Sequence, residues 1–411
     1  MLDIVFLHQN FPGQFRHLAP ALAAAGHRVR ALALNERPVG PGVARSRYAV
    51  QRRPGADTHP LLREAETKVL RGEACVQALG RLAADGVPDL VIANPGWGEA
   101  LFVKDLLPQA PLVCLLEFYY GTAGGDVGFD PEFAQPGLAE RMRQRLKNLA
   151  LTEALLAMDQ GVAPTAWQAS RLPQAWASRV EVVFDGIDTD RLQPDPAARF
   201  TWPAAGLDLK AGQQVVTFVN RQLEPYRGYH SFMRSLPALQ RRCPQAEVVL
   251  VGGDGVSYGA AAPAGRTWKQ HFLDEVAGQL DLSRVHFVGP LPYDDLVRLL
   301  QVSAAHVYLT YPFVLSWSCL EAMSLGCHVV ASRTAPVLDF IEDGVNGSLV
   351  DFFDADALAE RVAQVLHDQG SATDRAIRRA ARDTAVQRCD LQRVCLPRWR
   401  ALLSRTMGQP V

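Results

Sequence analysis

The sequence lacks an excess of charge of either sign. Its 42 Lys and Arg residues nearly balance its 43 Asp and Glu residues, so the formal net charge is −1. A balanced chain offers no bulk attraction to the phosphate backbone of a nucleic acid. The composition therefore predicts no nucleic-acid partner.

Long apolar runs are also missing. No apolar stretch reaches the roughly 20 residues that a membrane-spanning helix requires. The opening residues MLDIVFLHQN are typical of an apolar strand, and they lack the basic start of a signal peptide. These features predict a cytoplasmic protein.

Cysteine is scarce, and none of its seven occurrences has the spacing of a zinc site. Most of them lie in apolar surroundings, so we expect reduced and mainly buried thiols. No His, Asp and Cys cluster has metal-ligand spacing, and no catalytic triad or paired carboxylates are evident. We therefore expect neither a bound metal nor a cofactor.

The 411 residues exceed one typical domain, and strands alternate with helices in both halves. This pattern predicts an α/β fold of two Rossmann-like, doubly wound domains, with a substrate in the cleft between them. The expected domains are residues 1–190 and 212–370. Between them we expect an irregular linker, 191–211, which is rich in proline. A helical tail, 371–411, is expected to pack back toward the first domain.

Several local features of the first half are also predicted. A helix is expected over residues 14–25, kinked or shortened by Pro20. Residues 36–57 are rich in Pro, Gly and Arg and are typical of irregular structure, and one helix is expected over 138–158.

Residues 307–350 are typical of a strand, a tight loop, a helix over 317–325 and further βαβ units. Ligands of parallel sheets bind at the carboxyl ends of the strands, beside helix N-termini. The backbone amides of Ser316, Trp317 and Ser318 would suit a phosphate there. Simple helix capping explains the two serines equally well, and both roles can coexist.

Five segments of the second half carry specific motifs in a fixed order. They read VVTFVNRQLEPYRGYHSFMRSLP, VVLVGGDG, VHFVGPLPYDDLVRLL, LEAMSLGCHVVAS and DGVNGSLV. Together they resemble the retaining glycosyltransferases of family 4. In the first half, AAGHRV and FDGIDTDRLQP also fit, and HQNFPGQFRHLAPAL resembles a bacterial subgroup. The resemblance covers nearly all of residues 1–370.

The resemblance implies the GT-B arrangement, two Rossmann-like domains with an inter-domain cleft. It also implies transfer of a sugar from a UDP-, GDP- or ADP-linked donor to a hydroxyl acceptor, such as a glycan or a lipid-linked molecule. The reaction would retain the anomeric configuration and need no metal. A role in bacterial surface polysaccharide synthesis follows by resemblance alone.

Arg221 and Arg227 are the candidate catalytic cations. The resemblance places both on the donor diphosphate, and two cations at the end of a strand would neutralise the charge of the leaving group. The family's second cation is usually a lysine, and the spacing here is one residue longer. The alternative is two solvated loop arginines.

Glu321 matches the second of two family glutamates and would accept hydrogen bonds from the ribose diol. The alternative is a capping box, in which Ser318 is the N-cap and Glu321 satisfies the start of the helix. If Ser316 is the N-cap instead, the box fails and Glu321 lies further into the helix.

The sequence departs from the family pattern at three positions. Phe313 stands where the first family glutamate contacts the donor sugar, so Phe313 is expected to line the sugar pocket or to pack within its loop. His328 replaces a proline. Glu117 replaces a histidine, and would either orient an acceptor hydroxyl or donor sugar, or pair with Arg or amide groups.

Four further positions are expected near the donor. Gly252 and Gly253 would let the backbone approach the ligand, although glycines after strands are often only turns. Leu291 belongs to a turn that the resemblance places beside the base. Gly13 is a candidate for close approach to the donor phosphate.

Two basic runs are open to two interpretations. One is Arg375, Arg378, Arg379 and Arg382, and the other is Arg141, Arg143, Arg145 and Lys147. They are either solvated helix faces or contacts with an anionic membrane surface.

Two other functions remain as alternatives. A GT-B sugar-nucleotide epimerase would need additional acids and a histidine in the cleft. A non-catalytic nucleotide-sugar-binding protein is favoured by Phe313 in place of the usual acid.

Overall fold

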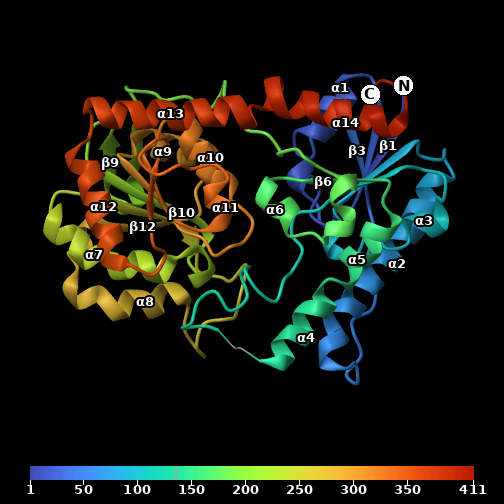
Figure 1. Ribbon diagram of the computed structural model, residues 1–411, viewed down its shortest axis with the longest axis horizontal. Coiled ribbons are helices and arrows are strands. Elements are labelled where there is room, and N and C mark those ends of the chain that lie inside the picture. Colours follow the sequence, from blue (N-terminus) through green and yellow to red (C-terminus); the bar gives the residue numbers. More distant parts are fainter. Residues whose placement is uncertain (135–136) are drawn as a thin grey trace. The chain divides into compact units, whose positions relative to one another are not determined.

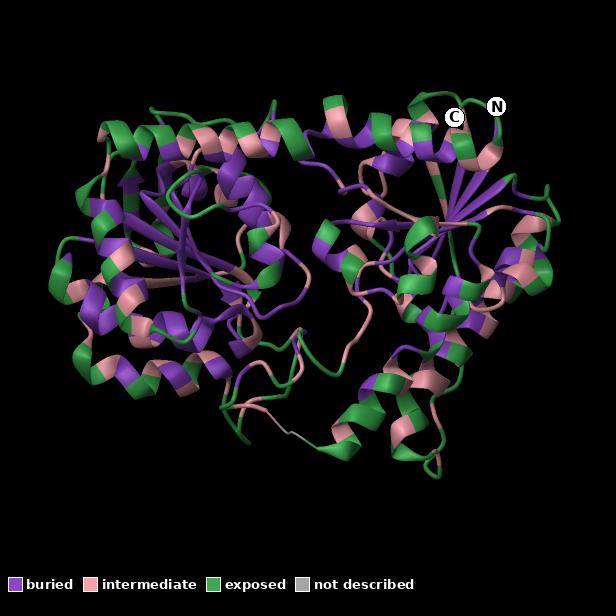
Figure 2. Ribbon diagram, viewed as in Figure 1, coloured by how far each residue is buried: buried purple, intermediate pink, exposed green. Residues whose placement is uncertain are grey.

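The computed structural model describes residues 1–134 and 137–411, which form two compact units (Figure 1). Unit 1 contains Met1–Gly186 and Leu391–Val411, and unit 2 contains Ile187–Asp390. Each unit holds one parallel sheet, and the strands are its most buried part (Figure 2). The predicted fold class of two Rossmann-like domains is confirmed.

The sheet of unit 1 has the strand order β3-β2-β1-β4-β5-β6-β7, and all of its pairs are parallel. Its strands are β1 (Asp3–Leu7), β2 (Arg28–Ala33), β3 (Val43–Arg47), β4 (Leu90–Ala93), β5 (Leu112–Leu115), β6 (Gln160–Ala163) and β7 (Val180–Val182). The central strands β1, β4 and β5 are almost wholly apolar, as expected for strands covered on both faces.

Helices cover both faces of this sheet. They are α1 (Leu18–Ala24), α2 (Arg63–Ala83), α3 (Val103–Leu106), α4 (Leu138–Lys147), α5 (Leu149–Ala157), α6 (Ala166–Ser170) and α14 (Leu396–Met407). Short 3-10 turns are η1 (Gly13–Phe15), η2 (Pro60–Leu62), η3 (Pro95–Trp97) and η4 (Gln174–Arg179). Trp399 and Leu402 of α14 join the apolar core cluster that contains Phe6 and Phe15.

Three local predictions for unit 1 were inaccurate. The helix expected over 14–25 starts only at Leu18, because Pro20 then lies in its first turn, where no backbone N–H is lost from the helix ladder. The segment 36–57 contains the edge strand β3, whose exposed side chains hide the apolar strand pattern. The helix expected over 138–158 is divided at Asn148.

The sheet of unit 2 has the order β12-β11-β10-β13-β14-β15 and is also entirely parallel. Its strands are β10 (Val215–Gln222), β11 (Glu247–Gly253), β12 (Val285–Gly289), β13 (Ala305–Tyr308), β14 (Val329–Ser332) and β15 (Ser348–Val350). Its helices are α7 (Tyr229–Arg242), α8 (Trp268–Val276), α9 (Tyr293–Val302), α10 (Trp317–Ser324), α11 (Ala335–Leu338), α12 (Ala355–His367) and α13 (Ala372–Cys389). Short turns are η5 (Pro203–Ala205), η6 (Pro225–Arg227), η7 (Ala277–Gln279) and η8 (Leu282–Arg284).

The expected linker is not an irregular segment. Residues 191–211 belong to unit 2 and include an antiparallel pair, β8 (Arg199–Trp202) and β9 (Leu207–Lys210). Phe200 and Leu209 are buried in this hairpin. Each strand of the hairpin has only four residues and lies near prolines. The alternation of buried and exposed side chains is therefore too brief to be recognised in the sequence.

The expected C-terminal tail is divided between the units. Helix α13 belongs to unit 2, whereas the turn η9 (Leu391–Cys395) and α14 belong to unit 1. All seven cysteine side chains are buried, as predicted. Among the described residues, no helix combines the length and apolar character needed to span a bilayer.

Candidate donor and acceptor sites

Each sheet reverses its strand order once, and polar side chains gather at both reversals. In unit 2 the reversal lies between β10 and β13, and in unit 1 it lies between β1 and β4. At such a point the two flanking connections leave in opposite directions, which opens a crevice at the carboxyl ends of the strands. These two edges are therefore the candidate sites.

Helix α10 begins beside the unit 2 reversal, and its N-cap is Ser316. The amide of Ser316 donates a 2.8 Å hydrogen bond to the Tyr308 hydroxyl, and the Ser316 and Ser318 hydroxyls lie 3.0 Å apart. The capping box based on Ser318 is therefore not formed. Glu321 lies beyond the first helical turn, as expected for the alternative in which Ser316 is the cap.

The Glu321 carboxylate is buried and is held by a neighbouring helix. The hydroxyl of Tyr293, the first residue of α9, donates a 2.8 Å hydrogen bond to Glu321 Oε1. Leu291, two residues before α9, is half-buried in the turn that follows β12. The structure thus brings the base-side turn and Glu321 together through Tyr293, which sequence reasoning missed. The sequence signal for this contact was the hydroxyl-bearing Tyr293, which is the first residue of the helix after the Leu291 turn.

The two candidate arginines have different environments. Arg221 lies near the end of β10 and is exposed. Arg227 is buried, and its Nη1 donates hydrogen bonds to Thr310 Oγ1 at 2.7 Å and to the Val314 carbonyl at 2.9 Å. Arg227 thus fixes the loop that leads from β13 to α10, and its placement on the donor diphosphate stays a prediction.

Phe313 is buried in an aromatic cluster. Its ring centroid lies 5.4 Å from that of Tyr226 and 5.0 Å from that of Tyr258, and the Arg227 guanidinium lies 5.7 Å from the Phe313 ring. The Tyr311 ring packs against that of Tyr226 in a tilted arrangement, with the centroids 4.6 Å apart. Of the two expectations for Phe313, packing within the loop is the one for which the structure shows contacts.

The glycines beside this edge allow close backbone approach. A Cβ at Gly253 would lie 2.5 Å from Gln222 Oε1, and one at Gly252 would lie 3.0 Å from the Asn220 carbonyl. Gly228 has a φ of +69°, and a Cβ there would lie 2.3 Å from Leu309 Cβ. Glycine is favoured most strongly at Gly228, where the positive φ and the Leu309 Cβ both oppose a side chain, whereas the Gln222 side chain could move away from a Cβ at position 253.

Glu224 is a further site residue that the sequence analysis missed. It is buried, and its carboxylate accepts hydrogen bonds from the Ser257 and Tyr258 amides at 3.0–3.2 Å. Burial raises the pKa of Glu224 to about 7, against the lowering effect of these two amides and of Arg227 and Arg221. Glu224 therefore holds the segment after β11 against the start of α7, next to Arg227. The sequence signal for Glu224 was its position as an acidic residue just beyond the carboxyl end of β10.

The unit 1 edge is organised around Glu117, which follows β5. Its Oε1 accepts a hydrogen bond of 2.5 Å from Gln14 Nε2, and its Oε2 accepts one of 2.7 Å from Asn94 Nδ2. His8 lies 2.9 Å from Gln14 Oε1, and burial lowers the pKa of His8 to about 4. Pairing with amides, one of the two alternatives for Glu117, is thus present, and it fixes the direction of the carboxylate.

Gly13 lies within the same cluster. Its φ is +47°, and a Cβ there would lie 2.7 Å from the His8 ring. Any side chain at position 13 would displace His8, which in turn orients Gln14 toward Glu117. His8 and Asn94 were not predicted as site residues, although each directly follows a strand of this sheet.

Two arginines of the α13 basic run, Arg378 and Arg382, make structural contacts, whereas Arg375 and Arg379 are exposed. Arg378 donates hydrogen bonds to the Ala304 and Gly326 carbonyls, and Arg382 donates to the Leu192, Ser324 and Thr189 carbonyls. The end of α10 leaves carbonyl groups without helical partners, and a cation is favourable there. These two arginines attach α13 to the rest of unit 2.

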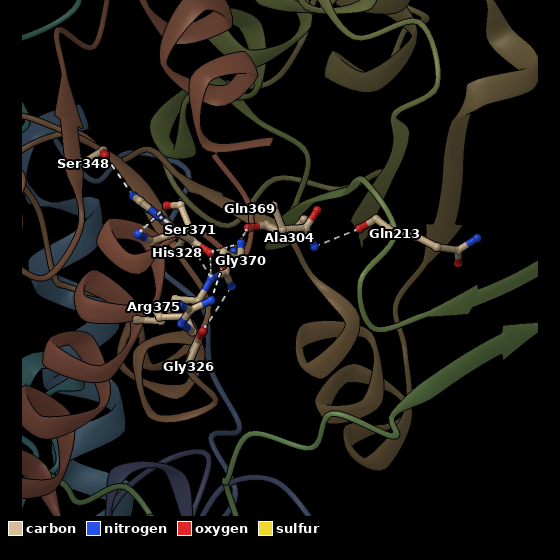
Figure 3. A network of polar contacts seen from close by, with 11 residues as sticks. Gln213, Ala304, Gly326, His328, Ser348, Gln369, Gly370, Ser371 and Arg375 are labelled. Atoms are coloured by element: carbon tan, nitrogen blue, oxygen red, sulfur yellow. Dashed lines mark hydrogen bonds and ion pairs between the residues drawn. The ribbon is translucent and has the colours of Figure 1, made fainter. Parts of the chain in front are cut away.

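His328 belongs to the same attachment (Figure 3). Its Nδ1 lies 2.9 Å from Asp374 Oδ1 and its Nε2 lies 3.0 Å from Ser348 Oγ. All three side chains are buried, so this Ser–His–Asp arrangement has no substrate access and serves packing. The replacement of proline by His328 is explained by this network.

Two family models match the chain over most of its length. Residues 25–192 match the model described as "Glycosyl transferase family 4 group", and residues 205–384 match "Glycosyl transferases group 1". The chain belongs to the family 4 glycosyltransferases. Glu321 and the sheet edge of unit 2 lie within the residues that the second model matches.

Curated relatives share part of this glycosyltransferase sequence. It is 32% identical over 217 residues to a D-inositol 3-phosphate glycosyltransferase of Mycobacterium sp. (strain KMS), a match that covers 53% of this chain and 45% of the relative. The enzyme of the same name from Mycolicibacterium smegmatis is 30% identical, with 51% and 45% covered. The chain thus spans about half the length of the curated relatives it matches.

Solved structures share the GT-B fold. Anabaena Alr3699/HepE, solved in complex with UDP and glucose, has a TM-score of 0.67 and 19% identity, with 98% of this chain and 100% of that chain covered. Sucrose-phosphate synthase from Thermosynechococcus elongatus has a TM-score of 0.72 and 19% identity over the same shares. The fold predicted from the motifs is therefore confirmed.

Proposed function

We propose that this protein is a retaining glycosyltransferase that moves a sugar from a nucleotide-diphosphate sugar to a hydroxyl acceptor. The observation that carries the proposal is the buried Glu321, oriented by Tyr293 beside the start of α10 at the strand-order reversal of unit 2. A carboxylate can accept two ribose hydroxyls, and an adjacent helix N-terminus favours a phosphate.

Arg221 is the residue that we assign to the donor diphosphate. It is exposed at the end of β10, so its guanidinium can form charge-assisted hydrogen bonds with phosphate oxygens. Arg227 would act mainly through the loop that it holds, which carries Ser316 to its position. Ser316, Trp317 and Ser318 would supply amides to the phosphates.

The donor sugar would lie beside Phe313 and the aromatic cluster, with Gly252 and Gly253 close to the nucleotide. Leu291 would contact the base. A uridine nucleotide is the first candidate, because Alr3699/HepE was solved with UDP and with UDP-glucose. GDP- and ADP-linked donors are the alternatives.

The proposed chemistry is a front-face displacement. The bond between the anomeric carbon and the diphosphate breaks, and the acceptor oxygen bonds to the same face of that carbon. The departing diphosphate takes the acceptor proton, so no separate general base is needed. Arg221 and the α10 N-terminus stabilise the negative charge that develops on the diphosphate.

Unit 1 would supply the acceptor contacts. Glu117 is fixed by Gln14 and Asn94 and is suited to accept a hydrogen bond from a sugar hydroxyl. Because Gly13 has no side chain, the loop after β1 that carries Gln14 could approach the donor phosphate closely. The relatives named for D-inositol 3-phosphate make a polyol one acceptor class, and a glycan or glycolipid of a bacterial surface polysaccharide, made in the cytoplasm, is the other.

A second candidate is a nucleotide-sugar-binding protein without turnover, which Phe313 in place of the family acid favours. Purified protein incubated with UDP-, GDP- and ADP-sugars distinguishes the two. Release of nucleoside diphosphate, lost in Glu321→Ala and Arg221→Ala, supports the transferase. Nucleotide binding without turnover on any donor or acceptor supports the binding protein instead.

A further inference from the structure

An exposed tryptophan stands on the turn that follows β4 in unit 1. Trp97 closes the 3-10 turn η3, and 40% of its surface is exposed. Among the described residues, its indole ring stacks on no other ring and meets no cation, and its Nε1 has no hydrogen-bond partner. A single exposed apolar residue is ordinary, so the role of Trp97 must be argued from its surroundings.

The backbone of this turn is fixed on several sides. The Asn94 side chain caps the turn by accepting a 3.1 Å hydrogen bond from the Gly96 amide, and Arg71 Nη1 donates a 2.6 Å hydrogen bond to the Trp97 carbonyl. Gly98 has a φ of +106°, and a Cβ there would lie 2.3 Å from a backbone carbonyl oxygen of α2. The turn is therefore held in one conformation, and the indole is the group that it leaves at the surface.

The same turn is joined to the candidate acceptor site. Asn94 caps η3 through its Oδ1 and donates a 2.7 Å hydrogen bond from its Nδ2 to Glu117 Oε2. One carboxamide thus fixes both the Glu117 carboxylate and the turn that carries Trp97. Three residues of a 3-10 turn advance only about 6 Å, so the two groups belong to the same edge of the sheet.

An indole beside a fixed carboxylate and carboxamides suits a sugar. A pyranose ring has a face of C–H groups, which packs on an indole, and a rim of hydroxyl groups, which donate to a carboxylate and accept from a carboxamide. A chain of linked sugars can place its reacting sugar at Glu117 and the next sugar on Trp97. A phosphate group would gain nothing from the indole.

We propose that Trp97 is a stacking platform for a sugar of the acceptor, and that the acceptor is therefore an oligosaccharide and not a single-ring polyol. This inference rests on the proposed function, because it assigns the ligand of the candidate acceptor edge. Trp97 would bind the acceptor and take no part in the transfer itself.

The test is binding of the purified full chain to a glycan array, with and without UDP. The array carries neutral di- to pentasaccharides of glucose, galactose, mannose, rhamnose and N-acetylglucosamine, the matching monosaccharides, and inositol 3-phosphate. We expect the chain to prefer oligosaccharides. Trp97→Ala should bind them about tenfold more weakly, because the apolar contact of the indole is lost. Trp97→Phe should keep most of the affinity, because an aromatic face remains.

Leu106→Ala is the matched control. It removes a side chain of unit 1 with a similar exposure, 38%, from α3, which precedes β5 and so lies toward the opposite end of that strand. This control should bind oligosaccharides as the unmodified chain does, and circular dichroism confirms that each variant is folded. Binding to no oligosaccharide, equal binding to monosaccharides or to inositol 3-phosphate, or equal losses in Trp97→Ala and Leu106→Ala would overturn the proposal.

Nucleotide binding is measured separately by calorimetry of the unmodified chain. A chain that binds none of UDP, GDP and ADP would contradict the proposed function. Nucleotide binding together with oligosaccharide binding that Trp97→Ala leaves intact would contradict only the role of Trp97.

Discussion

The hydroxyl of Tyr293 donates a 2.8 Å hydrogen bond to Oε1 of Glu321, which joins the start of α9 to the second turn of α10. Tyr293→Phe removes this bond but keeps the ring, so Glu321 loses its fixed direction. We expect the donor KM to rise about tenfold, or about 1.4 kcal/mol, with a smaller change in kcat. Tyr229→Phe is the control, because it loses a hydroxyl bonded to the Lys269 carbonyl instead. Equal effects of the two variants would contradict a specific role for Tyr293.

Replacement of Arg221 and of Arg227 by alanine should have different effects on stability and on activity. Arg221→Ala should leave the free energy of unfolding nearly unchanged and should lower kcat/KM about 100-fold, since an exposed phosphate contact is lost. Arg227→Ala should lower the free energy of unfolding by about 2–4 kcal/mol, because buried charge-assisted hydrogen bonds are lost. Urea denaturation and steady-state kinetics measure both quantities. A stable, inactive Arg227→Ala would show that Arg227 contacts the donor directly.

Asp374 should govern the acid stability of unit 2. Burial raises its pKa, but hydrogen bonds from His328, Arg378 and the Gly370 amide outweigh that effect and lower the pKa to about 2. The carboxylate therefore contributes stability above pH 4 that is lost as the pH falls toward 2. Asp374→Asn should lower the free energy of unfolding at pH 7 by about 3 kcal/mol. Asp383→Asn, an exposed acid on the same helix, should have almost no effect.

Glu224 should produce the opposite pH dependence. Its pKa is raised to about 7 by burial, so the folded state binds a proton that the unfolded state releases near pH 4.5. Its stability contribution is complete below pH 4.5 and is lost as the pH rises through 7. Relative to the unmodified chain, Glu224→Gln should gain about 2–3 kcal/mol between pH 5 and pH 8. A pH-independent difference, or the same trend in the exposed control Glu360→Gln, would contradict this assignment.

The sequence was sufficient to predict the main strands of both sheets, but it did not predict the local polar contacts. The alternation of strands and helices could be predicted in both halves, because parallel strands buried on both faces are continuous apolar runs between turn residues. β3, β8 and β9 were missed because they are short and partly exposed. The division of the tail between two units depends on packing that no local pattern encodes.

The candidate sites were predicted as positions but not as interactions. Glu117, Glu321 and Arg221 lie at the sheet edges where the motifs placed them. Their partners Gln14, Asn94 and Tyr293 come from strands and helices far away in sequence, with separations of 103, 23 and 28 residues. Arg227 and Phe313 were assigned from the family pattern, whereas their burial depends on the aromatic residues Tyr226 and Tyr258 that surround them.

The central claim is transfer with retention from a nucleotide-diphosphate sugar, and proton NMR of the products tests it most directly. An α-linked donor sugar, the protein and a polyol or glycan acceptor should give nucleoside diphosphate and an α-linked product, and Glu321→Gln should abolish both signals. A β-linked product, or no turnover with UDP-, GDP- and ADP-linked donors, would contradict the account.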